Sequence, residues 1–203
     1  MGAFQTVFDN AQTISINKKK KVGQSVARDG TIKTTSFGGQ VWTFEVKLPD
    51  GMPWTSMRPL IEQMEALDRV TTSTVQISNP NLSYISGYQG NLNTTTTITA
   101  SFSTGNTLTV VSAPAIGAGY RFKSGDVIQL GTSGGVYSIV NDVAYNGGII
   151  TLNRPVREAA GTYTLIVGQS VTWNVICTTF PQWTLFDHNQ VSWSGPFIFS
   201  EAL

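Results

Sequence analysis

The stretch VWTFEVKLPDGMPWTSMRPLIEQMEALDRVTTSTVQIS, residues 41–78, predicts a strand, a turn, an amphipathic helix and a second strand, in that order. Its first part has the two-residue period of a strand with one apolar face, made of Trp42, Phe44, Val46 and Leu48. Apolar residues then recur three and four positions apart, as along one side of a helix: Met57, Leu60, Ile61, Met64 and Leu67. We expect this helix, at about residues 56–68, to cover the apolar face of the strand.

The start of this helix is marked by a serine and a proline. Ser56 is the expected N-cap, because its hydroxyl can accept a hydrogen bond from the first turn. Pro59 is expected in the first turn, where its missing N–H costs no helical hydrogen bond.

The composition favours a β-rich protein that contacts other subunits. The 203 residues suffice for one large domain or two small ones, and 20 of them are glycine. Lys plus Arg number 13 against 12 for Asp plus Glu, which gives no net attraction to nucleic acid or to a membrane. The single cysteine, Cys177, excludes an intramolecular disulfide. Without a signal sequence or a run of about 20 apolar residues, we expect a soluble chain with no membrane span.

Two discontinuous parts are expected to form one domain around an insertion. Residues 83–170 carry short apolar runs separated by turn residues, the first of them at Tyr84–Tyr88. Interpreted as short strands, these runs predict a small antiparallel β-barrel domain. Residues 1–80 and 171–203 share large aromatic strand residues, and the chain is expected to begin with short strands at 4–8 and 12–17. The predicted fold is therefore mainly β with one principal α-helix: a β-sandwich or split barrel with an inserted small antiparallel barrel.

A basic and glycine-rich segment precedes residues 41–78. Four lysines run from Lys18 to Lys21, and Asp29-Gly30 then suggests a hairpin or a long loop. In an otherwise neutral chain, a solvated hairpin or a contact with an acidic neighbouring subunit explains the lysines better than nucleic-acid binding does. Glu45, in mid-strand opposite the aromatic face, either meets solvent or pairs across a subunit boundary. The expected interface residues are Lys18, Lys19, Lys20, Lys21, Arg28, Asp29, Glu45 and Lys47.

No constellation in the sequence predicts catalysis, a cofactor or a metal. His188 is the only histidine, so a zinc or iron site lacks a second one, and we expect it in a polar turn. No Gly-x-Ser-x-Gly elbow is present, and the glycine-rich stretches lack the Lys-Ser/Thr pair of a phosphate loop. We therefore expect no enzyme.

Aromatic residues leave one alternative open. Flat exposed rings beside polar turns bind pyranose sugars, so the chain is alternatively a carbohydrate-binding module for host-surface glycans. Trp42 and Trp173 lie in alternating strands and are expected in the core. The candidate stacking residues are Tyr88, Trp183 and Trp193.

Several motifs, in this order, carry a resemblance to a known group of proteins. They are Gly38-Gly39-Gln40-Val41-Trp42-Thr43-Phe44-Glu45-Val46, Phe122-Lys123-Ser124-Gly125-Asp126-Val127-Ile128, Val136-Tyr137-Ser138-Ile139 with Leu152-Asn153-Arg154-Pro155-Val156-Arg157, and Gly195-Pro196-Phe197-Ile198-Phe199-Ser200-Glu201. In this order the chain resembles tail proteins of tailed bacteriophages, particularly the ring-forming distal tail or baseplate-hub components.

The resemblance implies a structural role in a virion. Such proteins have a β-sandwich or split barrel flanked by a helix, often with an inserted barrel, and pack side by side around the tail tube. For this chain it implies a ring of copies, expected to be hexameric, at the tail tip or baseplate hub. The implied partners are further copies and other tail or baseplate proteins, such as the tail tube and hub, with no direct nucleic-acid readout. The chain would be made in the host cytoplasm and end in the virion.

Overall fold

The computed structural model describes residues 2–18, 22–36, 39–67, 70–92, 97–114 and 118–202. By their contacts these residues form two compact units: unit 1, up to Asn10 and Ser73–Asn174, and unit 2, Ala11–Thr72 and Val175–Ala202. The divisions fall near Thr72 and Asn174, a few residues from the predicted boundaries at 80 and 171. The first residues of the chain belong to the unit that contains the barrel.

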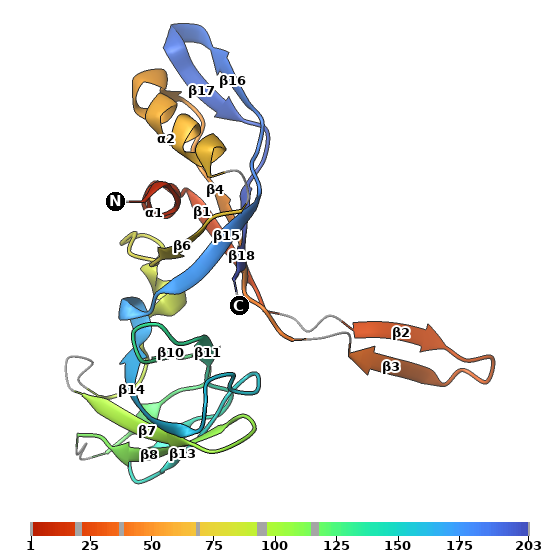
Figure 1. The fold of residues 1–203 in the computed structure, drawn as a ribbon, viewed down its shortest axis with the longest axis vertical. Coiled ribbons are helices and arrows are strands. Elements are labelled where there is room, and N and C mark those ends of the chain that lie inside the picture. The colour runs from red at the N-terminus through yellow and green to blue at the C-terminus, as the bar shows by residue number, and fades with distance from the viewer. Residues whose placement is uncertain are drawn as a thin grey trace. The chain divides into compact units, whose positions relative to one another are not determined.

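Most of the elements along the chain are β-strands (Figure 1). Two α-helices are present in the described residues, and α2 is the longer, so the predicted mainly-β fold with one principal helix is confirmed. The helices and 3-10 turns are α1 (Ala3–Asp9), α2 (Trp54–Ala66), η1 (Ser83–Ser86), η2 (Gly168–Ser170) and η3 (Asp187–Asn189). The strands are β1 (Thr13–Asn17), β2 (Val22–Val26), β3 (Ile32–Ser36), β4 (Thr43–Lys47), β5 (Met52–Pro53), β6 (Thr72–Val75), β7 (Ile98–Phe102), β8 (Thr107–Ser112), β9 (Tyr120–Phe122), β10 (Val127–Leu130), β11 (Val136–Ser138), β12 (Val143–Ala144), β13 (Ile149–Thr151), β14 (Gly161–Val167), β15 (Trp173–Thr179), β16 (Trp183–Phe186), β17 (Gln190–Trp193) and β18 (Phe197–Glu201).

The main sheet of unit 2 brings the two ends of the predicted discontinuous domain together. Its strands run in the order β1-β4-β18-β15, and each neighbouring pair is antiparallel. Phe199 of β18 lies opposite Phe44 of β4, and both are fully buried. The predicted apolar face of this strand region is confirmed, because its four side chains are all buried: Trp42, Phe44, Val46 and Leu48.

Helix α2 lies close to β5 and β17. Its predicted apolar side is confirmed, since Met57, Leu60, Ile61 and Met64 are buried. The helix begins at Trp54, directly after Pro53, whose extended backbone fixes the chain before the first turn. Ser56 is therefore not the N-cap, and Pro59 lies inside the helix.

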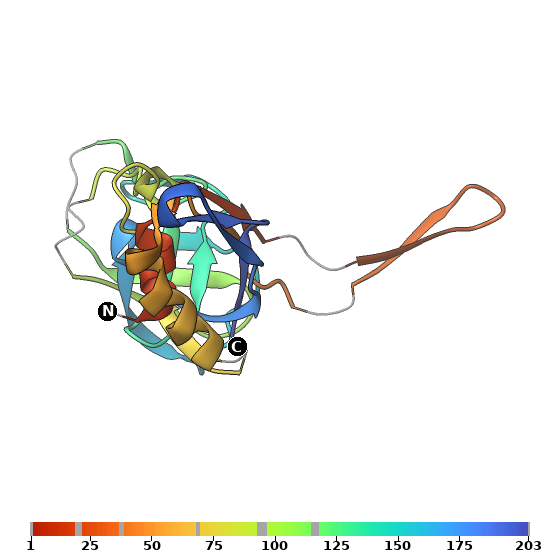
Figure 2. The same ribbon diagram turned by 90° about the horizontal axis from the view of Figure 1, so that it is seen from above.

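A separate two-stranded sheet, β2–β3, forms the predicted hairpin (Figure 2). Five residue pairs are in register, from Val22 opposite Ser36 to Val26 opposite Ile32. The turn is closed by hydrogen bonds from Ala27 N to Thr31 O and from Gly30 N to Ala27 O. Gly30 has φ +83°, a left-handed conformation that a residue without Cβ adopts without strain. This is the Asp-Gly turn that the sequence predicted.

The strand expected at residues 4–8 is instead helix α1. Phe4, Val7 and Phe8 are spaced three and four apart and are all buried, which is the helical period. The side chain of Gln5 pairs with the backbone of Gln76, accepting from its N–H at 2.8 Å and donating to its carbonyl at 3.0 Å. This pairing fixes α1 along the segment that follows β6.

The inserted part is a small antiparallel barrel, as predicted. Its six strands run in the order β11-β10-β14-β7-β8-β13 (Figure 1). The two edges meet beyond β11 and β13, where Ile139 bridges Leu152 and Val140 N donates to Thr151 O at 2.9 Å. The core inside is apolar and contains Leu92, Ile98, Ala100, Phe102, Leu108, Phe122, Ile128, Leu130, Tyr137, Ile139, Val143, Ile150, Leu152, Leu165 and Val167.

The apolar run Tyr84–Tyr88, expected to be a strand, is not one. Residues 83–86 form the 3-10 turn η1, because Asn79 O accepts hydrogen bonds from Leu82 N and Ser83 N and starts a turn there. Among the described residues, no helix is both long and apolar enough to span a bilayer.

Candidate functional site

The hairpin β2–β3 is largely exposed in its described part. No side chain described between residues 23 and 35 is buried. Val26 is 71% exposed and Ile32 is 62% exposed, and the two lie directly opposite each other beside the turn. The apolar pair Val26/Ile32 is thus held in solvent by backbone pairing alone.

The expected interface residues fall into three groups. Lys19, Lys20 and Lys21 are outside the described residues. Lys18 is half-buried, with Nζ 5.2 Å from the centre of the Trp42 ring, and burial lowers the pKa of its ammonium group. The ammonium group of this lysine thus contacts the Trp42 ring of its own unit.

The other expected interface residues are exposed. Arg28 and Asp29 lie in the hairpin turn, where Asp29 Oδ1 accepts a hydrogen bond from Thr31 N at 2.9 Å. That hydrogen bond lowers the pKa of Asp29. The carboxylate therefore stabilises the hairpin turn. Glu45 and Lys47 are exposed on β4.

The edge strand β1 adjoins this region in sequence. It is the end strand of its sheet and consists of Thr13–Asn17, TISIN, without charge or proline. Natural edge strands usually carry a charge, a proline or a bulge that prevents pairing with another chain. The five residues of β1 include no charged residue and no proline, and their pairing with β4 has no bulge.

His188 lies at the tip of the β16–β17 hairpin and not in a cleft. Its Nδ1 is 2.8 Å from Asp187 Oδ2, and the two side chains are 82% and 84% exposed. His188 and Asn189 have φ 60° and 56°, the left-handed conformations of a tight turn. In the described part of the chain, no group of three or more His, Cys, Asp or Glu residues could hold a metal ion.

The two candidate tryptophans differ in their exposure. Trp193 is only 5% exposed and packs against Phe180 and Phe197, with ring centres 6.1 and 5.0 Å away. The expected sugar-stacking role of Trp193 is therefore wrong, because no ring face is accessible. Trp183 is half-buried, with its ring centre 5.1 Å from that of Trp54.

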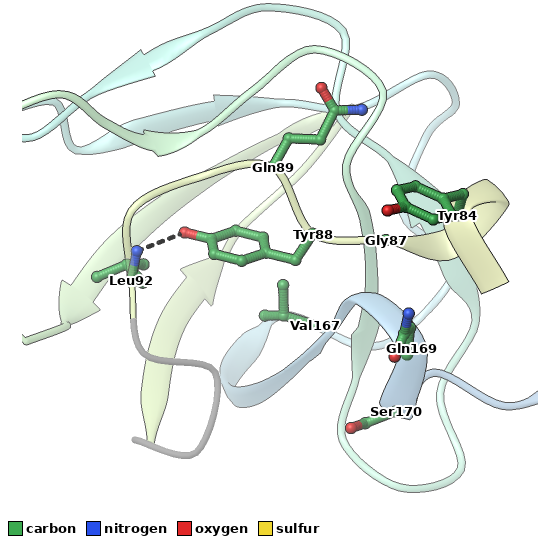
Figure 3. A pocket seen from close by; sticks show the side chains of 8 residues that line it. All are labelled: Tyr84, Gly87, Tyr88, Gln89, Leu92, Val167, Gln169 and Ser170. Carbon is green, nitrogen blue, oxygen red and sulfur yellow. Dashed lines mark hydrogen bonds between the residues drawn. The ribbon is translucent and has the colours of Figure 1, made fainter. Parts of the chain in front are cut away.

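Tyr88, the third candidate, borders a cavity within unit 1. The cavity has a volume of about 760 Å³, within the usual range for small-molecule pockets. Its lining comes from residues 84–92 on one side and 167–170 on the other (Figure 3). Buried Leu92 and Val167 give it an apolar part, while Gln89, Gln169 and Ser170 are exposed.

Tyr88 is held rigidly at this cavity. Its hydroxyl accepts a hydrogen bond from Leu92 N at 2.9 Å, drawn in Figure 3, and donates one to Arg121 O. Its ring meets Phe122 edge-on at 6.1 Å, and burial raises the pKa of its hydroxyl. Gly168, at φ +66°, passes so close that an added Cβ would lie 2.9 Å from Tyr88 Cβ.

Sequence reasoning missed most of this cavity. Tyr84 was assigned to a strand, and Gln89, Gln169 and Ser170 were not singled out. These residues belong to no motif, and about 80 positions separate the two lining segments. Only the fold around the barrel places them together.

Comparison with known proteins leaves the function open. No protein-family model matches the chain, and a search of curated protein sequences gives no match.

Proposed function

We propose that this chain is a structural subunit of a bacteriophage tail, which joins copies of itself and neighbouring tail proteins in a ring at the tail tip or baseplate hub. The order of sequence motifs described above supports the tail assignment. The structural observation that supports the proposal most strongly is the exposed hairpin β2–β3. The role requires contact surfaces and no reaction.

The hairpin has the properties of an assembly arm. A two-stranded hairpin is at best marginally stable in water, because it buries too little apolar surface to offset the entropy of ordering its backbone. This one buries none of the side chains described between residues 23 and 35 and presents the apolar pair Val26/Ile32. Contact with a neighbouring subunit would bury that pair and stabilise the hairpin.

The edge strand β1 supplies a second contact surface. An uncharged strand at a sheet edge presents backbone N–H and C=O groups to any chain that can pair with them. A hairpin and a strand edge are different surfaces, so their contact would be heterologous, and heterologous contacts close into rings when the rotation allows.

The oligomeric state of the full-length protein tests this proposal. Size-exclusion chromatography with light scattering should give a closed oligomer, and electron microscopy of that fraction should show rings. The double variant Val26→Asp/Ile32→Asp should shift the protein to monomer. The matched control is Val111→Asp/Ile149→Asp, which changes two residues of unit 1 that are 60% and 63% exposed and should leave the oligomer intact.

The position in the virion needs a separate measurement. Antibodies against the chain should label the tail tip in micrographs of virions whose genome encodes it. A wild-type chain that stays monomeric at all concentrations and is missing from purified tails would contradict the proposal.

A further inference from the structure

The cavity beside Tyr88 combines a fixed aromatic wall with uncommitted polar groups. The Tyr88 hydroxyl is occupied by Leu92 N and Arg121 O, so this ring serves as a wall and not as a hydrogen-bonding group. By contrast, the side chains of Gln89, Gln169 and Ser170 make no hydrogen bond with other described residues. Two amides and one hydroxyl are therefore available, and each can both donate and accept.

The charge of the lining restricts the ligand further. None of the residues that line the cavity is charged. A phosphate or carboxylate would lose its hydration on entering and find no cation in return. The lining thus favours a neutral ligand.

Tyr84 adds a free aromatic ring at the same cavity. It lies in the turn η1 and is 90% exposed, an unusual position for a large ring that lines a cavity. Figure 3 shows Tyr84 and Tyr88 on one segment and Gln169 and Ser170 on the other. A ligand between the segments would meet a ring and amide groups together.

From these features we infer that the cavity is a binding site for neutral sugars, with Tyr84 stacking on a pyranose ring and Gln89, Gln169 and Ser170 bonding its hydroxyls. A pyranose has an apolar face of C–H groups and a rim of hydroxyls that donate and accept, which matches this lining. This inference is independent of the assembly role, because it concerns unit 1 alone.

The test is titration of the full-length protein, followed by NMR of its backbone amides. The probes are three neutral oligosaccharides, maltotriose, cellotriose and chitotriose, and one acidic one, 3′-sialyllactose. At least one neutral probe should shift the amide signals of residues 84–92 and 167–170. Tyr84→Ala should weaken that binding about tenfold, and Gln169→Ala should also weaken it.

The control variant is Tyr145→Ala, which removes another exposed tyrosine of unit 1, 45% exposed and outside the cavity lining. It should bind the sugar as wild type does. The inference is overturned if no neutral probe shifts these signals, if Tyr84→Ala binds as well as wild type, or if sialyllactose binds more tightly than every neutral probe.

Discussion

The buried hydroxyl of Tyr137 joins two segments of the barrel. The side chain is fully buried, and its hydroxyl donates to Glu158 Oε2 at 2.6 Å and accepts from Arg157 N at 3.0 Å. Glu158 in turn accepts a hydrogen bond from Gly135 N, in the turn before β11. Burial, and then the bond to Glu158, raise the pKa of Tyr137, so the hydroxyl stays protonated and can donate.

We expect Tyr137→Phe to lower the free energy of unfolding by about 1–3 kcal/mol, because Glu158 and Arg157 N–H each lose a partner in a partly buried site. Urea unfolding followed by tryptophan fluorescence measures the change. Tyr145→Phe is the matched control, since that tyrosine is 45% exposed. Equal stability of the two variants would show that the buried network contributes nothing.

Asp126 is a buried carboxylate that anchors the cavity wall. Its two oxygens accept from Gln89 N at 2.8 Å and from Lys123 N at 2.7 Å, and the residue has no exposed surface. Burial raises the pKa of this carboxyl above its ordinary value, against the lowering effect of the two hydrogen bonds. The folded protein therefore binds this proton more tightly than the unfolded chain does.

That shift predicts a pH dependence with a definite sign. The stabilising contribution of protonation is present below about pH 4, the ordinary pKa of aspartate, and is lost as the pH rises through the folded-state value. The unfolding free energy of wild type minus that of Asp126→Asn, which cannot titrate here, should thus be larger at pH 4 than at pH 7. Urea unfolding at both pH values measures it, and a difference that grows with pH would contradict the prediction.

Two glycines with the same backbone conformation lie in turns of two different elements. One element is the exposed hairpin and the other packs on the barrel core. Gly30 in the β2–β3 hairpin and Gly105 in the β7–β8 turn have φ +83° and +84°, and an added Cβ would meet nothing within 4 Å at either. Alanine at each position therefore introduces backbone strain of about 1–2 kcal/mol without a clash. Only the barrel turn is tied to a hydrophobic core.

We expect Gly105→Ala to lower the global unfolding free energy by that amount and Gly30→Ala to leave it unchanged within about 0.5 kcal/mol. Gly30→Ala should instead speed hydrogen exchange of amides within residues 22–36, because the hairpin opens without unfolding the core. Mass spectrometry of exchanged peptides separates the two effects. An equal global loss in both variants would mean that the hairpin unfolds together with the rest.

At the scale of the whole molecule, the barrel core is contained in one continuous stretch. Every residue of that core lies between Leu92 and Val167, and the edges of the sheet meet at the Ile139–Leu152 bridge. The fragment 81–172 also keeps the hydrogen bond from Thr172 N to Gln129 Oε1, at 3.0 Å. The core cluster and the bridge between the sheet edges therefore both lie within this fragment.

We expect fragment 81–172 to fold alone, with a β-type circular dichroism spectrum and a single cooperative thermal transition. The same fragment with Leu108→Asp, which places a charge in the core, should show neither. A wild-type fragment that stays unfolded would show that the barrel needs the rest of the chain.

The sequence by itself determined the features that depend on local period and turn chemistry. The alternating face of β4, the apolar side of α2, the Asp-Gly hairpin and the short strands of the barrel all follow from spacing within about 15 residues. Helix α1 was missed because seven residues hold too few periods to separate a helix from a strand.

Only the tertiary structure decided which distant residues meet. Lys18 lies over Trp42, the ring of Trp183 lies beside that of Trp54, and Gln169 faces the same cavity as Tyr84. These contacts depend on how strands far apart in sequence pair and on where the barrel closes, and no period within one segment encodes them. Burial, and with it the raised pKa of Asp126, is likewise a property of the packed fold, because it depends on what covers a side chain and not on its neighbours in sequence.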